Sequence, residues 1–180
     1  MNPHFLYNSL STISSMAIEA GEDRIADTCE RISQMLRYSS SYSSGGATLG
    51  SEIENVRNYL ELMKLRYEEY FDYDLSLDER LEGMAIPRLI IQPIMENAVE
   101  HGLAGRAGKI MLRIYAEDDK LKIEVINDGL MTQEDKRKVE ALLSDSPDMA
   151  EQHSVSLGIR NVNKRLKIIY GPDCGLTIKN

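Results

Sequence analysis

The chain has 180 residues, of which 42% are hydrophobic, and a formal net charge of −8 at pH 7, which suits one domain or a small domain with a helical appendage. The acidic balance disfavours nucleic acid as a partner, because phosphate contacts need an excess of Lys and Arg. No apolar run approaches the ~20 residues that span a bilayer, and the first residues show neither the basic nor the apolar segment of a signal peptide.

The first 70 residues are expected to be almost entirely helical. Apolar side chains recur every three or four residues on both sides of a break at Gly21, which predicts an antiparallel pair of helices. One apolar side of such a hairpin stays uncovered, and we expect it to pack on a second copy of the chain or on the following domain. A third helix is expected from Ser51 to Tyr70, with Ser51 as its cap and Glu54 completing a capping box.

From Phe71 onwards the periodicity changes, and strands are expected among helices. Tyr73–Leu77 alternates as a strand, and Ile86–Gly102 is expected to be a helix that begins at Pro87. The other expected elements are a β-hairpin of 109–116 and 121–126, helices from near Thr132 and over 157–170, and a closing strand over 176–179. The predicted class is α+β, with a helical hairpin followed by an α/β sandwich whose mixed sheet carries helices on one face.

The helix expected over Ile86–Gly102 has four polar residues beside its apolar side: Glu96, Asn97, Glu100 and His101. A buried amide without partners costs roughly 1–3 kcal/mol, so an Asn at this position points to a ligand. An Asn beside carboxylates and a His can bind a hard cation or a phosphate-bearing ligand. The alternative is an ordinary amphipathic helix with solvated polar groups.

Four motifs follow one another along nearly the whole chain. They are the runs Pro3–Asn8, Gln92–Gly102, Asn127–Gly129 and Gly158–Leu166. In this order they resemble the phosphoacceptor box, the N box and the two glycine boxes of the LytS-type sensor histidine kinases. The resemblance implies a phosphoacceptor and dimerisation region over 1–70 and an ATP-binding catalytic domain of the Bergerat (GHKL ATPase) type over 71–180.

The resemblance implies that His4 is the residue that is phosphorylated. An imidazole with an ordinary pKa near 6.5 is a good nucleophile at neutral pH, and Asn8, one turn on, could orient its ring or a water molecule. Many histidine kinases have an acidic residue directly after this His, where the chain has Phe5. The base must therefore come from elsewhere, or the imidazole must already be neutral.

In the N box the resemblance implies that Asn97 binds Mg²⁺ through its side-chain oxygen. Mg²⁺ prefers few protein oxygens together with phosphates and waters, so a single Asn is chemically adequate. His101 and Gly102 would lie beside the phosphates and sugar of ATP. Glu96 could act as a base or support the metal ligand, and the residues leave these two roles open.

The first glycine box departs from the family pattern. Asn127 stands where the family has the Asp that accepts a hydrogen bond from the adenine amine, Asp128 and Gly129 follow, and Met131 replaces the second glycine. An Asn carbonyl can still accept this bond, but without charge assistance. A shift of one residue would present Asp128 instead, and a plain strand-ending turn is the alternative to a binding role.

The second glycine box has Ser156 in place of its first glycine, while Gly158 remains at the expected helix start. Backbone amides at a helix N-terminus favour phosphate oxygens. Asn161 and Arg165 follow as candidates for nucleotide binding, although Arg165 could equally be a solvated charge. The polar stretch 130–155 would form a lid over the nucleotide.

The function that the resemblance implies is a two-component sensor histidine kinase, which autophosphorylates a His with Mg²⁺-ATP and passes the phosphoryl group to an Asp of a response regulator. It implies a homodimer in the cytoplasm, attached to the membrane only through an upstream segment outside this chain. Two alternatives stay open: a degenerate dimerisation module with weak or no ATP use, which the altered glycine boxes favour, and a general ATPase or anti-sigma kinase of the same fold, which is disfavoured because the motif Pro3–Asn8 would then have no role. Cys29 and Cys174 form no paired motif and are expected to be free thiols.

Overall fold

The computed structural model describes residues 3–40, 46–103, 107–129, 136–137, 139–140, 143 and 154–178. The helices are α1 (Pro3–Glu19), α2 (Asp23–Ser40), α3 (Leu49–Tyr67), α4 (Gln92–Leu103) and α6 (Ser154–Tyr170). The strands are β1 (Ala47–Thr48), β2 (Phe71–Leu77), β3 (Ala85–Ile86), β4 (Gly108–Glu117) and β5 (Lys120–Asn127), and short 3-10 turns lie at Glu68–Tyr70 and Glu79–Leu81. These elements confirm the predicted α+β class.

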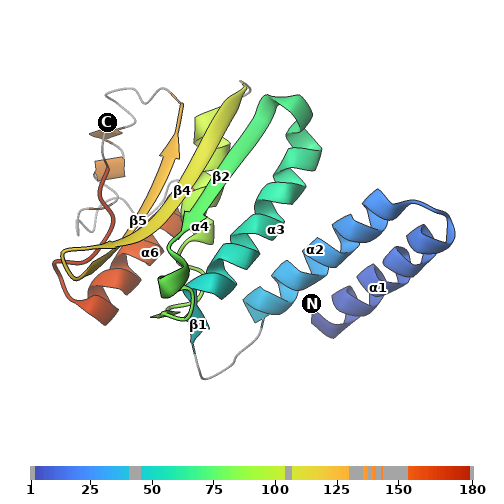
Figure 1. The fold of residues 1–180 in the computed structure, drawn as a ribbon, viewed down its shortest axis with the longest axis horizontal. Coiled ribbons are helices and arrows are strands. Elements are labelled where there is room, and N and C mark those ends of the chain that lie inside the picture. The colour runs from blue at the N-terminus through green and yellow to red at the C-terminus, as the bar shows by residue number, and fades with distance from the viewer. Residues whose placement is uncertain are drawn as a thin grey trace.

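The predicted helical hairpin is present, because α1 and α2 pack side by side in antiparallel directions (Figure 1). The chain reverses at Gly21, whose φ of 73° lies in the left-handed region that glycine adopts without steric cost. On its other side α2 packs on α3, so α1 is the outermost helix of the molecule in this view (Figure 1).

Helix α3 begins at Leu49, two residues before the predicted start. The predicted cap at Ser51 and capping box with Glu54 are wrong, because Thr48 is the cap and Ser51 is its partner in the box. The Thr48 hydroxyl accepts from the Ser51 backbone nitrogen at 3.2 Å, and the Thr48 backbone nitrogen donates to the Ser51 hydroxyl at 3.0 Å. The α-helix ends at Tyr67 rather than Tyr70.

The main sheet has the order β2-β4-β5 and is mixed, with β2 parallel to β4 and β4 antiparallel to β5. The predicted hairpin is confirmed, and its turn is formed by Asp118 and Asp119, both with positive φ, as type I′ hairpin turns require. Helices α4 and α6 cover one face of the sheet, and α3 lies along β2 (Figure 1). Ile110, Leu112 and Ile114 of β4 are buried in one core with apolar residues of α3, α4 and α6.

The helix predicted to begin at Pro87 begins only at Gln92, after a loop over residues 87–91. Leu89 has a φ of 57°, which no right-handed helix accommodates. The backbone nitrogens of Leu89, Ile90 and Ile91 donate to the Glu52 carboxylate of α3 instead of to helix carbonyls. A proline does lie in the first turn of α4, but it is Pro93 and not the predicted Pro87.

The C-terminal part differs from expectation in one described segment. Residues 176–178 form no strand, and the Leu176 backbone nitrogen donates to Asn163 Oδ1 of α6 at 2.9 Å. Lys179 lies outside the described residues, as does most of the helix expected from near Thr132. The last predicted helix is confirmed, although α6 begins three residues earlier, at Ser154. None of the helices within the described ranges is long and apolar enough to span a membrane.

Candidate functional site

Helix α4 separates an apolar side from the polar residues of the predicted N box. Met95, Ala98 and Val99 are buried against the sheet and the neighbouring helices. Glu96 and Asn97 are half-buried, and Glu100 is exposed. The side chains of His101 and Gly102 lie outside what the structure describes, although their backbone belongs to α4. The polar side of α4 is therefore open to a ligand at Glu96 and Asn97.

The Asn97 carboxamide fits the role of a metal ligand that the resemblance implies. Within the described ranges it makes no hydrogen bond to another residue, so its oxygen is not committed to the fold. The same part of the chain contains no group of three or more His, Cys, Asp or Glu side chains that could hold a metal ion. An Mg²⁺ ion bound mainly by ATP phosphates needs only one or two protein oxygens, which Asn97 can supply.

A chain of hydrogen bonds leads from α3 to Glu96. The Asn55 amide donates to Gln92 Oε1, and the Gln92 amide donates to Glu96 Oε1 at 2.7 Å. Asn55 is buried, and its Oδ1 has no hydrogen-bond partner. These contacts fix the Glu96 side chain next to Asn97, with one carboxylate oxygen already accepting a bond.

Tyr59 of α3 faces the acidic side of α4. Burial, followed by the negative charge of Glu96 and a smaller effect of Glu100, raises the pKa of Tyr59. The Tyr59 hydroxyl therefore stays protonated at neutral pH beside these carboxylates. The negative charges at this side of the candidate site, those of Glu96 and Glu100, both come from α4, and they suit a cation more than a bare phosphate.

The predicted adenine-binding residues use their side chains locally. Asn127 Oδ1 accepts from the Gly129 backbone nitrogen at 3.1 Å, and both Asp128 oxygens accept from the Lys109 backbone nitrogen at 3.1 and 3.0 Å. Asn127 and Asp128 are exposed at the end of β5. These bonds are those of a strand-ending turn tied to the start of β4, so binding adenine would require one of these acceptors to be shared or released.

The second glycine box lies on α6. Gly158 is in the second turn rather than at the helix start, which corrects the prediction, and a Cβ built on it would lie 3.6 Å from Pro93 Cβ of α4. Asn161 and Arg165 are exposed, and Arg165 Nη1 donates to the Arg88 carbonyl oxygen at 2.9 Å. The box thus brings α6 against the start of α4. The expected lid, 130–155, falls almost entirely outside the described residues.

The predicted phosphoacceptor His4 is exposed in the first turns of α1, and Asn8 lies beside it. Asn8 Nδ2 is 3.4 Å from His4 Nδ1. Helices α2 and α3 lie between α1 and α4 (Figure 1), so this arrangement does not bring His4 to Asn97 within one chain. The structure therefore groups the site residues into two places, one on α1 and one around α4 and α6.

Sequence reasoning missed three residues that join the end of the helical hairpin to the start of α4: Tyr38 of α2, Glu52 of α3 and Arg88 of the loop before α4. Glu52 is fully buried and accepts hydrogen bonds from this loop and from the Tyr38 hydroxyl. One signal was available, because Glu52 stands between the apolar residues Leu49 and Val56 on the buried side of α3. A charged residue in such a position is buried with partners.

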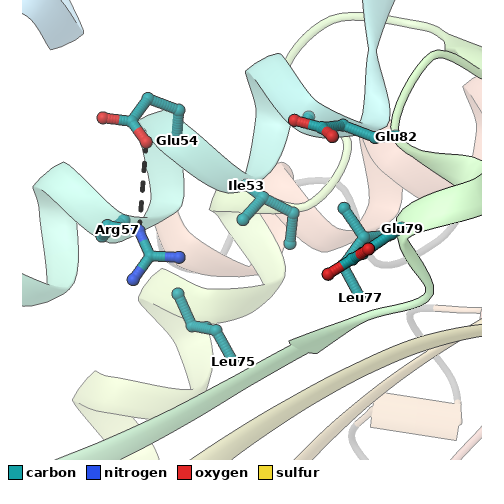
Figure 2. A pocket seen from close by; sticks show the side chains of 8 residues that line it. Ile53, Glu54, Arg57, Leu75, Leu77, Glu79 and Glu82 are labelled. Atoms are coloured by element: carbon teal, nitrogen blue, oxygen red, sulfur yellow. Dashed lines mark ion pairs between the residues drawn. The ribbon is translucent and has the colours of Figure 1, made fainter.

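A separate hollow of about 280 Å³ lies between α3 and β2 (Figure 2). Figure 2 shows Ile53, Leu75 and Leu77 in this hollow, with Glu79 and Glu82 on one side and the Glu54–Arg57 ion pair on the other. None of the site residues predicted from the sequence lines it. It contains no feature that identifies a ligand.

Comparisons with known proteins find similarity to sensor histidine kinases. The family model for histidine kinases matches residues 1–71. Sensor histidine kinase YesM of Bacillus subtilis (strain 168) is 27% identical over 182 residues, which cover 99% of this chain and 29% of that protein. Sensor protein LytS of Oceanobacillus iheyensis is also 27% identical, over 100% of this chain and 31% of that protein. The chain thus spans less than a third of the length of these relatives.

Among solved structures, the histidine kinase domain of the blue-light activated histidine kinase EL346 of Erythrobacter litoralis is similar. It is 16% identical, with a TM-score of 0.49, and the alignment covers 91% of this chain and 85% of that domain.

Proposed function

Because this chain is related over its whole length to the LytS-type sensor histidine kinases, we propose that it is the kinase region of such a sensor. In this proposal it binds Mg²⁺-ATP beside α4 and transfers the γ-phosphoryl group to His4. One observation carries the proposal: His4, with Asn8 beside it, is exposed at the start of α1, within the residues that match the histidine kinase family.

The proposed reaction forms a bond between a ring nitrogen of His4 and the γ-phosphorus, and it breaks the bond to the oxygen that leaves with ADP. In the tautomer with a lone pair on Nε2, the proton is on Nδ1, and a half-turn of the Asn8 amide presents Oδ1 as its acceptor. Asn97 would hold Mg²⁺, which neutralises charge on the phosphate oxygens when bound. After the transfer the Nδ1 proton leaves to solvent, and in this proposal Glu96 takes it only where α4 of a second protomer lies against His4, because α1 and α4 of one chain lie apart.

The separation of α1 from α4 bears on how the phosphoryl group would reach His4. Either the hairpin moves relative to the sheet, or the nucleotide of one protomer faces His4 of its partner. We favour the second route, because α1 exposes apolar side chains that a second copy would cover; Phe5 and Met16 are each 64% exposed. In the complete protein we propose a membrane-anchored sensor with a cytoplasmic kinase region that passes the phosphoryl group to a response regulator.

The proposal is tested by incubating the chain with labelled Mg²⁺-ATP. We expect label that is lost in acid and stable in alkali, as a phosphorus–nitrogen bond is, and no label in His4→Gln. Ser11→Ala, at an exposed hydroxyl on the same helix, is the control and should label like the wild type. Equal labelling of His4→Gln and wild type, or label that survives acid, would contradict the proposed acceptor.

A second candidate function is a dimerisation or binding module with weak or no ATP use. It is favoured by the local hydrogen bonds of Asn127 and Asp128, which occupy the acceptors expected to bind adenine. Titration calorimetry with Mg²⁺-ATP separates the two functions. A dissociation constant in the micromolar range supports the kinase, whereas one weaker than about 1 mM, or −4.1 kcal/mol, supports the binding module.

A further inference from the structure

Glu52 is a buried carboxylate whose hydrogen bonds converge from distant parts of the chain. Its side chain is 0% exposed although it is charged, and its neighbour Ile53 on α3 is also buried. Oε1 accepts from the Leu89 backbone nitrogen at 2.6 Å, and Oε2 accepts from Ile90 and Ile91 at 2.9 and 3.0 Å. A buried carboxylate is tolerated only with such partners, so Glu52 and the loop before α4 determine each other's position.

These bonds end where α4 begins. The Ile91 carbonyl oxygen accepts from the backbone nitrogens of Ile94 and Met95, both at 3.1 Å, so Ile91 is the residue that opens the helix. Its own backbone nitrogen is bound to Glu52, which therefore fixes the first turn from outside the helix. Asn97 is six residues further, about 9 Å along the axis, and moves with this turn.

The same carboxylate also contacts the end of the helical hairpin. The Tyr38 hydroxyl, on the last turn of α2, donates to Glu52 Oε1. Burial, and after it the bond to Glu52, raises the pKa of Tyr38, so the hydroxyl remains a donor at neutral pH.

Arg88 adds a second connection at this point. Its Nη1 donates to the Tyr38 carbonyl oxygen at 2.7 Å, and its guanidinium lies 4.7 Å from the centroid of the Tyr38 ring. The Arg88 carbonyl oxygen accepts from Arg165 of α6. The end of α2 is thus bonded to the loop before α4 both through Glu52 and directly.

We propose that Glu52 is a positioning residue for the nucleotide site: it fixes α4, and with it Asn97, and it makes this position depend on the end of α2 through the Tyr38 hydroxyl. The proposal rests on the proposed function for its effect on nucleotide binding. A displacement of the hairpin end would thereby reach the proposed metal ligand Asn97 through the Glu52 carboxylate, beside the direct contact of Arg88 with Tyr38.

The first test compares Glu52→Gln with Val56→Ala in the full chain. Gln retains the size of Glu, but one of its two terminal atoms is a donor that faces backbone donors of the loop. Val56 is 0% exposed on the same helix and belongs to the core, so Val56→Ala destabilises the protein without removing a hydrogen bond to the loop. The dissociation constant of a non-hydrolysable ATP analogue is measured with and without Mg²⁺, well below the melting temperature of both variants.

We expect Glu52→Gln to weaken binding in Mg²⁺ by about tenfold and to reduce the gain in affinity that Mg²⁺ gives, because Asn97 is displaced. Val56→Ala should change the affinity in Mg²⁺, and the gain in affinity that Mg²⁺ gives, by less than about twofold. Equal effects of the two variants, or an unchanged affinity in Glu52→Gln, would overturn the proposal in favour of a purely structural role.

The second test is a double-mutant cycle with Tyr38→Phe, which removes only the hydroxyl and is expected to fold. Tyr38→Phe should weaken analogue binding by about twofold to threefold alone and have no effect in the Glu52→Gln background. Additive effects would overturn the link to the hairpin.

If the wild type binds no nucleotide, the proposed function fails, and amide hydrogen exchange then decides this proposal. Faster exchange over residues 94–97 in Glu52→Gln than in Val56→Ala supports it, and equal exchange overturns it.

Discussion

At the scale of single residues, the buried polar side chains of α3 explain how the hairpin and the sheet are joined. Asn58 donates to Gln34 Oε1 of α2 at 2.9 Å, while Asn55 and Glu52 bond to the segment that leads into α4. Such groups cost several kcal/mol when left unpaired but little when paired, so they favour one relative position of the elements. Helix α3 therefore specifies its neighbours by hydrogen bonds as well as by apolar packing.

Tyr73 provides a pH-dependent prediction at the same scale. Its hydroxyl donates to Glu61, and burial followed by this bond raises the pKa of Tyr73 to about 12. The unfolded chain loses this proton near pH 10 and the folded chain only near pH 12. The contribution to stability is thus complete below pH 10 and is lost as the pH rises towards 12.

We expect the free energy of unfolding to fall between pH 10 and 12, and to fall less steeply in Tyr73→Phe. One proton accounts for at most about 1.4 kcal/mol per pH unit, and for less here because Tyr73 is only half-buried. Urea denaturation at several pH values measures the slope. The same slope in both proteins would contradict the role assigned to this hydroxyl.

The candidate site shows which residues a sequence pattern can suggest. The roles of His4, Asn8 and Asn97 stay predictions, and they could be proposed because their motifs are local runs that fall on helices. Glu52 could not be proposed in this way, because its backbone partners in the loop are 37 to 39 residues away and no local pattern contains them. The roles assigned to Asn127 and Asp128 remain predictions, since their local bonds already use the acceptors that adenine would have to share or displace.

At the scale of elements, periodicity predicted the kind of the longer helices and strands better than their ends, while the short strands β1 and β3 were missed and the closing strand expected over 176–179 does not form over 176–178. The strands β2, β4 and β5 follow from alternation, which burial of one face imposes. The starts of α3 and α4 were misplaced because Thr48 caps the former and Glu52 holds the loop before the latter. Serine and proline are compatible with several positions near a helix start, so tertiary contacts decide among them.

The β4–β5 turn gives a prediction for an element. Asp118 and Asp119 have φ values of 50° and 58°, a conformation that costs any residue with a side chain more than glycine. Asp119→Gly should therefore raise the free energy of unfolding by about 0.5–1 kcal/mol. Glu117→Gly, at an ordinary strand position paired with Lys120, should instead lower it by about 1 kcal/mol. Urea denaturation of both variants checks the pair, and a loss of stability in Asp119→Gly would contradict the assigned turn.

At the scale of the whole molecule, the packing order is α1, α2, α3 and then the sheet with α4 and α6 (Figure 1). The apolar residues of α3 belong to the same core as those of β2, β4 and α4. The boundary placed at residue 70 between a phosphoacceptor region and an ATP-binding domain stays a prediction. Within the described residues α1 packs mainly on α2, and apolar side chains on its side away from α2 are exposed.

A substitution at Met16 tests whether a second copy of the chain covers the side of α1 away from α2. Phe5, Ile13 and Met16 are 64%, 47% and 64% exposed, and their spacing of eight and three residues places them on one side of α1. In the proposed dimer Met16→Glu would bury a charge, so we expect a dimeric wild type and a monomeric variant by sedimentation or light scattering.

Analogue binding by Met16→Glu should be unchanged within about twofold, whereas labelling of His4 should fall at least about tenfold, because the nucleotide and His4 of one chain lie apart. Ser11→Glu adds the same charge to an exposed position of α1 that the helical period places roughly opposite the three exposed apolar side chains, and it should remain dimeric and active. A Met16→Glu chain that stays dimeric, or a monomer that labels His4 at the wild-type rate, would contradict transfer between protomers.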